Sequence, residues 1–351
     1  MENKPQHILT YFPGNLVESI KIPVCFTFPF DYEPHPLALK AATELQHYLE
    51  TQTDLDHNFG LTNDGKTPAI GKMFGVLVVQ DREGKSGYLS AFSGKLAGSN
   101  HHPKFVPPVF DMLDENCFFI KEIEVINSIN GRIRKIESGN NYKNLRQDFE
   151  QSSALSAKET ADLKKQLKIN KADRKKRKEE QLSEDNRNQL EADLIKQSLY
   201  DKYLLNELLN IWAEVLRGKK ASMGRSEAVL EELKNERKER SAALQQQLFD
   251  NYEFLNIDGK RKNLKAIFSG TASGKPPSAA GECATPKLLQ HAFLKGYTPI
   301  AMAEFWWGAS PKSEIRKHKQ IYPACTEKCK PILRHMLEGI YLEEDARKEI
   351  G

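Results

Sequence analysis

Three cysteines in the last quarter of the chain have the residue type and spacing to bind a metal ion. Cys325 and Cys329 lie four residues apart in "PACTEKC", so on a helix both side chains would point to the same side. Cys283 precedes them in "GECATPKLL", at the expected start of another helix. Thiolates are ligands that zinc prefers. The pattern predicts three buried structural cysteines without a cofactor, with a bound zinc ion as the alternative.

The segments around these cysteines predict a small α/β layer within residues 256–351. Residues 264–270 are predicted as a short strand, followed by a Gly/Ser/Pro-rich loop. A helix is expected to run from Cys283 to Gly296, where glycine favours a helix end. The apolar segment 298–308 predicts a buried strand, and 326–339 predicts a final helix. Alternating strands and helices indicate an α/β arrangement.

The order of these elements resembles that of zinc-dependent deaminases. Those enzymes bind zinc through a His or Cys at one helix start and two Cys at the next, while a Glu two positions after the first ligand moves protons. Here Thr285 occupies the position of that Glu, and Glu282 lies directly before Cys283. The second cysteine pair is spaced C-x3-C instead of C-x2-C. The resemblance implies a deaminase-like scaffold that has lost its activity.

Residues 1–140 predict a separate mixed α/β region. Segment 35–51 has helical apolar spacing, with Leu37, Ala41, Leu45 and Leu49 on one stripe. Two apolar runs, 76–79 and 88–92, predict a strand hairpin joined by a turn over 81–87.

Residues 141–255 predict a long antiparallel coiled-coil hairpin. Leu and Ile recur at three- and four-residue spacing among charged residues, and proline is absent. Gly218 and Gly224 offer a break between the two arms. The whole chain is therefore expected to be an α+β or α/β protein with three regions, 1–140, 141–255 and 256–351.

The densest basic block of the chain lies inside the predicted hairpin. A run of lysines and arginines with one acid among them, Asp173, can neutralise phosphates and make binding salt-dependent. The alternative is a solvated coiled-coil surface. The candidate RNA-binding residues in this block are Lys164, Lys165, Lys168, Lys171, Arg174, Lys175, Lys176, Arg177 and Lys178.

A second candidate RNA surface lies in residues 303–325, where aromatic and basic residues are mixed. Aromatic rings stack on bases and cations contact phosphates, which is the chemistry of single-strand binding. The alternative is that the tryptophans belong to the core. The candidate residues here are Trp306, Trp307, Lys312, Arg316, Lys317 and Lys319.

Three stretches together resemble the N-terminal extension of bacterial RluA-type RNA pseudouridine synthases: 71–113, 281–340 and the coiled coil between them. The resemblance implies an RNA-modification context, with rRNA or tRNA as partner and no cofactor for uridine isomerisation. In that family an Arg-Leu-Asp motif carries the catalytic Asp, and this chain contains none. No catalytic residue can be carried over, and a catalytic pseudouridine synthase domain would be a partner or a continuation of the chain.

Composition adds weaker limits. The chain has 52 basic and 48 acidic residues, for a net charge of +4, and no run of about 18 apolar residues. The first residues lack a secretory signal pattern. The sequence therefore predicts a cytoplasmic accessory RNA-binding module. A divergent zinc-dependent deaminase and a coiled-coil protein-interaction module are the alternatives.

Overall fold

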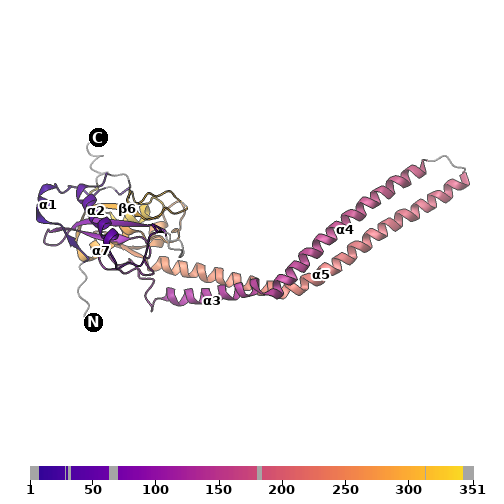
Figure 1. Cartoon of the computed structure of the whole chain (residues 1–351), viewed down its shortest axis with the longest axis horizontal. Helices are drawn as coiled ribbons and strands as arrows, with labels where there is room; N and C mark the ends of the chain where they lie inside the picture. The colour runs from indigo at the N-terminus through magenta and orange to yellow at the C-terminus, as the bar shows by residue number, and fades with distance from the viewer. Residues whose placement is uncertain are drawn as a thin grey trace. The chain divides into compact units, whose positions relative to one another are not determined.

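The computed structural model describes residues 8–27, 29–30, 33–62, 70–179, 184–312 and 314–342. It is a mixed α+β protein with one five-stranded sheet and long helices packed as a hairpin, as expected (Figure 1). The chain divides into two compact units. We call residues 1–122 with 243–351 the globular unit, and residues 123–242 the hairpin unit.

The globular unit is built on one antiparallel sheet with strand order β1-β3-β2-β6-β7. Its centre is β2, which pairs with β3 on one side and with β6 on the other. Strands from both ends of the chain therefore lie side by side, an arrangement that the sequence patterns did not indicate. The strands are β1 (Thr10–Tyr11), β2 (Lys72–Gln80), β3 (Ser86–Phe92), β6 (Thr298–Trp307) and β7 (Ile321–Tyr322).

Helices cover both faces of this sheet. Helix α2 (Pro36–Thr51) packs on one face and buries the predicted stripe of Leu37, Ala41, Leu45 and Leu49. Helices α7 (Ala284–Lys295) and α8 (Cys329–Met336) belong to the core on the other face. Because side chains alternate along a strand, each central strand contributes to two apolar cores and reads as a continuous apolar run.

The predicted strand over 264–270 is wrong, because these residues form helix α6 (Leu264–Phe268). The Asn263 side chain accepts a hydrogen bond from the Ala266 amide at 2.8 Å and caps the helix. Leu264 and Phe268, four residues apart, are both buried by the turn. The remaining short elements are α1 (Gly14–Ser19) and a two-stranded ribbon of β4 (Glu253–Leu255) with β5 (Arg261–Asn263).

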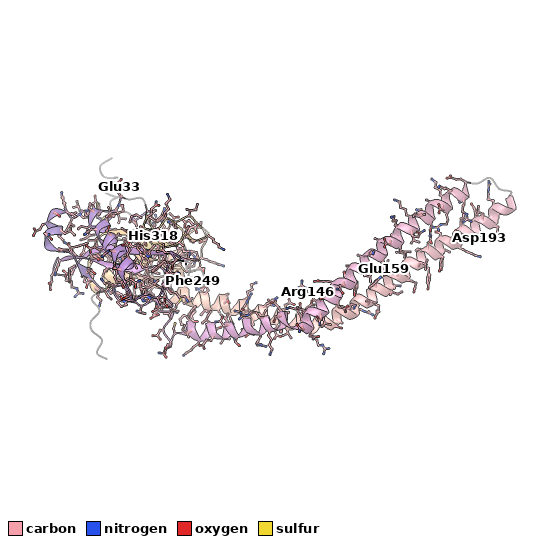
Figure 2. All side chains as sticks on the ribbon, viewed as in Figure 1. Glu33, Arg146, Glu159, Asp193, Phe249 and His318 are labelled. Carbon is pink, nitrogen blue, oxygen red and sulfur yellow. The ribbon has the colours of Figure 1, made fainter. Side chains whose placement is uncertain are left out.

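Three long helices form the hairpin: α3 (Phe118–Ser138), α4 (Asn140–Lys178) and α5 (Glu184–Asn251). Helices α4 and α5 run side by side, and Glu159 lies along α4 in Figure 2. Contacts between the arms confirm the antiparallel register, since partner numbers fall along one arm as they rise along the other. Examples are Glu137 with Lys234, Glu159 with Trp212, and Asn170 with Asp201.

The predicted break at Gly218 and Gly224 is wrong, because α5 is continuous through both glycines. A glycine inside a helix costs about 1 kcal/mol relative to alanine, and α5 tolerates both glycines. The interruption lies instead at Gly139, between α3 and α4 on the other arm. No helix among the described residues is long and apolar enough to cross a membrane.

Candidate metal centre

The structure brings the three predicted cysteines together at the ends of two helices. Cys283 is the residue that precedes α7, Cys329 is the first residue of α8, and Cys325 lies in the loop between β7 and α8. Their Sγ atoms all lie within 4.8 Å of one another. Cys329 is buried, whereas Cys283 and Cys325 are partly exposed. The C-x3-C spacing therefore does not prevent both sulfurs from meeting the third.

A glycine in the central strand allows α7 to bring Cys283 to this position. Gly75 of β2 pairs with Glu304 of β6. A Cβ atom added at Gly75 would lie 3.1 Å from Ala284 Cβ and 3.2 Å from Leu288 Cδ1. These distances are tighter than ordinary van der Waals contacts. The first turn of α7 can approach the sheet this closely because residue 75 has no side chain.

The pKa values of the three thiol groups are shifted in different directions. The pKa of Cys325 is lowered, because Cys283 and Cys329 donate hydrogen bonds to its sulfur, as do the backbone amides of Lys328 and Cys329. The pKa values of Cys283 and Cys329 are raised, chiefly by the same sulfur contacts and by burial. Hydrogen bonds from backbone amides near the N-terminus of α8 thus favour the thiolate form of Cys325.

The dimensions of the cluster fit a small thiophilic cation. A zinc ion with Zn–S bonds of about 2.3 Å in tetrahedral geometry separates its sulfur ligands by about 3.8 Å. The observed limit of 4.8 Å is close enough that small side-chain movements would complete the site. Among the described residues the cluster offers three sulfur ligands. Three protein ligands with a fourth position open are typical of catalytic zinc sites, whereas structural sites have four.

Glu304 is a residue of this site that the sequence patterns did not single out. It lies on β6, is 3% exposed, and its Oε1 accepts a hydrogen bond from the Thr285 amide at 3.2 Å. Burial raises the pKa of Glu304 to about 7, and the charge of Cys325 acts in the same direction. Glu304 also acts on the pKa of Cys283. A carboxyl group thus lies beside Thr285, the position where the deaminase pattern would place its own Glu.

Glu282, the other acid near the cluster, belongs to a different network. Its Oε2 atom forms an ion pair with Lys287 Nζ at 3.2 Å, and its Oε1 accepts a hydrogen bond from the Tyr252 hydroxyl. Lys287 is 2% exposed and also donates to the Gly94 carbonyl at 3.0 Å. These bonds hold the segment that precedes Cys283, so Glu304 is the carboxyl group of the site that forms no ion pair with a described residue.

The basic block of the hairpin forms the C-terminal part of α4. Eight of its nine predicted RNA-binding residues are exposed, and Arg174 is partly buried. Arg174 pairs with Asp201 of α5 at 2.5 Å, and Lys178 pairs with Glu191 at 3.2 Å. The structure therefore places the predicted cations on one helix, and assigns at least Arg174 to holding the arms together.

The second predicted RNA surface is divided by the geometry of β6. Side chains alternate along a strand, so Trp306 and Trp307 point to opposite faces of the sheet. Trp307 is 2% exposed in the core beneath α2, and Trp306 donates to the Ala309 carbonyl at 3.1 Å. Arg316 lies over the Tyr322 ring and pairs with Glu314, while Lys319 pairs with Glu50.

Three of the predicted cations in this loop are exposed, Lys312, Lys317 and Lys319, and of these Lys319 pairs with Glu50. Because Trp307 is buried, it is not available to stack on a base beside these cations.

Comparison of the chain with protein-family models, with curated proteins and with solved structures finds no match.

Proposed function

We propose that this protein is an accessory RNA-binding module of the RluA-type pseudouridine synthase context, without a catalytic uridine-isomerising site of its own. The observation that carries the proposal is the exposed basic block of α4, with nine Lys or Arg residues and one acid between Lys164 and Lys178. Eight of its nine cations are exposed on α4, and the ninth, Arg174, pairs with Asp201 of α5. Such a surface contacts phosphates without needing to read bases.

In this proposal the partner is rRNA or tRNA, and a catalytic pseudouridine synthase domain supplies the chemistry. The hairpin extends the reach of the module, and the exposed Lys312 and Lys317 of the globular unit add a minor contact. The resemblance in the globular segments supports this context. The basic block supports the RNA contact independently of the resemblance.

The test is the affinity of the full chain for a fluorescein-labelled structured RNA, measured by anisotropy at increasing KCl concentration. The expected result is binding at low salt and a linear fall of log K with log salt, with a slope of several units. Absence of binding at low salt would overturn the proposal, and so would an affinity that does not change with salt.

A second candidate function is favoured by the metal centre: a divergent zinc-dependent hydrolytic deaminase. The favouring observation is that Glu304 brings a buried carboxyl to Thr285, beside Cys283, Cys325 and Cys329. When bound, zinc at such a site would lower the pKa of water in its open position. The chain's own residues would bind the ion through three sulfurs, and Glu304 would accept hydrogen bonds from groups that enter the site.

This candidate is tested by ammonia release from cytidine, adenosine and single-stranded RNA, assayed with zinc-loaded protein. Release that disappears in Glu304→Gln, while zinc content stays unchanged, would establish the deaminase. A stoichiometric zinc content with no release from any of these substrates would assign the ion a structural role instead.

A further inference from the structure

One side of the hairpin tip carries a groove between its two arms. The groove has a volume of about 780 Å³ and is lined by α4 and α5. Its α4 wall is basic, and its α5 wall contains Leu194, Ile195 and Ser198 together with one acid. The cations that line it are Lys168, Lys171, Arg174, Lys175 and Lys178.

Only some of these cations form ion pairs within the chain. Arg174 pairs with Asp201, and Lys178 pairs with Glu191, the acid of the groove. Lys168, Lys171 and Lys175 form no ion pair with any residue in the described part of the chain. Three lysine charges therefore face a groove whose one acid is already paired. That imbalance favours an anionic ligand.

The free lysines follow the groove along a single line of the helix. Residues 168, 171 and 175 are separated by three and four positions, which places them on one face of α4. At about 1.5 Å of rise per residue, neighbouring charges are about 4.5 to 6 Å apart along the axis. Lys164 extends the same line by one turn. A row of cations at this spacing suits a polymer of regularly spaced anions better than a single phosphate.

We propose that this groove is the RNA-backbone site of the protein, and that Lys168, Lys171 and Lys175 contact phosphates of one strand in succession. The inference rests on the proposed RNA-binding function and narrows it from the whole basic block to one face of α4. Ile195, which is 60% exposed on the opposite wall, offers an apolar contact to riboses or bases.

An acidic amphipathic peptide is the other polymer with suitable charge, and the shape of the surface favours RNA over it. The cation row runs from Lys164 to Lys178, whereas the apolar lining is short and consists mainly of Leu194 and Ile195. Leu194 is only 7% exposed because it packs between the arms. An amphipathic helix needs a continuous apolar strip to dock, and the groove lining does not provide one.

The hairpin unit also offers a matched control outside the basic block. Lys143 and Lys158 of α4 and Lys220 of α5 are exposed, and none of them lines the groove. We compare the groove variant Lys168→Gln/Lys171→Gln/Lys175→Gln with the control variant Lys143→Gln/Lys158→Gln/Lys220→Gln. Both variants remove the same charge from the hairpin unit and keep good helix-forming residues.

The measurement is fluorescence anisotropy of a labelled 20-nucleotide oligouridine on the full chain, from 50 to 300 mM KCl. Loss of three phosphate contacts should reduce the magnitude of the salt slope by about 2, from the factor of about 0.7 per contact on single strands. We expect the groove variant to bind at least tenfold more weakly near 150 mM KCl, and the control variant to change less than threefold. Circular dichroism at 222 nm verifies that both variants keep their helices.

The possible outcomes distinguish a failure of the groove site from a failure of the proposed RNA-binding function. Equal losses in the two variants would overturn the groove site while leaving RNA binding by the hairpin intact. No binding of oligouridine or structured RNA by the unmodified chain would overturn the proposed function itself. Binding of an oligoglutamate peptide that the groove variant loses, with oligouridine binding unaffected, would overturn RNA as the ligand of the groove.

Discussion

In the globular unit the largest side chains lie in two apolar cores, whereas the hairpin unit has a small apolar cluster between α3 and α5 and polar contacts between α4 and α5. Phe74, Phe92 and Phe305 are fully buried around the sheet. In α4 no residue is buried, and its contacts with α5 include an ion pair, amide hydrogen bonds and an indole–carboxylate bond. The sheet is packed on both faces. Helix α4 instead remains solvated along most of its surface, and polar pairs join it to α5.

This difference bears on where metal binding and polyanion binding can occur in the molecule. A metal centre needs side chains held in fixed positions, and the ends of α7 and α8 provide them inside a packed core. Contact with a flexible polyanion needs exposed cations. The hairpin provides them on α4, a helix in which no residue is buried. Four predictions test whether the two units are as different as this comparison holds.

The largest expected effect concerns the metal. Cys283→Ser should lower zinc affinity by at least about a thousandfold, because it removes one of three sulfur ligands. Zinc content after dialysis, measured by mass spectrometry, gives the result. Cys117→Ser is the matched control, since Cys117 lies outside the cluster and should retain zinc. An unmodified protein without stoichiometric zinc would remove the metal centre from the comparison.

The next effect concerns the apolar core. Phe74→Ala should lower the free energy of unfolding of the globular unit by about 4 kcal/mol, because it leaves a cavity among four aromatic neighbours. Urea denaturation followed by near-ultraviolet circular dichroism measures it. The helical signal of the hairpin should respond much less. A common transition, shifted equally for both signals, would show that the two units unfold as one.

Glu304 predicts a pH dependence confined to the globular unit. Its pKa is about 7 in the folded protein and 4.5 in the reference state, so the folded state binds more protons between these values. The stability of the metal-free protein should therefore fall by up to about 3 kcal/mol as pH rises from about 4.5 to 7. In Glu304→Gln, the midpoint of urea denaturation should depend less on pH across this range. An unchanged slope in that variant would assign the dependence to other groups.

The smallest effect tests the polar contact of the hairpin. Asp201→Ala leaves the guanidinium of Arg174 without its carboxylate in a largely buried position, and should cost about 2 kcal/mol of hairpin stability. Thermal melting at 222 nm measures it. The exposed pair Arg146–Glu150 is the control, and Glu150→Ala should cost less than about 0.5 kcal/mol. Equal effects would mean that the burial of the Arg174–Asp201 pair adds nothing to hairpin stability.

Local patterns predicted most elements of the globular unit but not their assembly. The stripe of Leu37 to Leu49 predicted α2, and Gly296 marks the end of α7 with the left-handed conformation expected of a C-terminal glycine. Pairing between β2 and β6 was not predictable, because it joins segments more than 200 residues apart. Propensity also misassigned 264–270, where a capping asparagine and two buried side chains determine a helical turn.

The candidate site was predictable in its sulfur ligands and not in its carboxylate. Cys283, Cys325 and Cys329 carry a sequence signal because of their residue type. Glu304 could have been noticed as the lone acid in the apolar strand 298–307, a position where a charge is costly unless it has a role. Its place beside Thr285 depends on strand register, which no local pattern specifies.

The insertion of the hairpin between β3 and α7 has a consequence for synthesis of the chain. Strand β2 leaves the ribosome long before its neighbour β6. The edge of β2 that pairs with β6 therefore stays unpaired while the hairpin is synthesised. Closing so long a loop would be entropically costly. Packing of Ile129 and Ile133 on Leu230 and Leu233 draws the two ends of the inserted segment together. Early folding of the hairpin would thus shorten the effective loop between β2 and β6, and would favour pairing of these two strands.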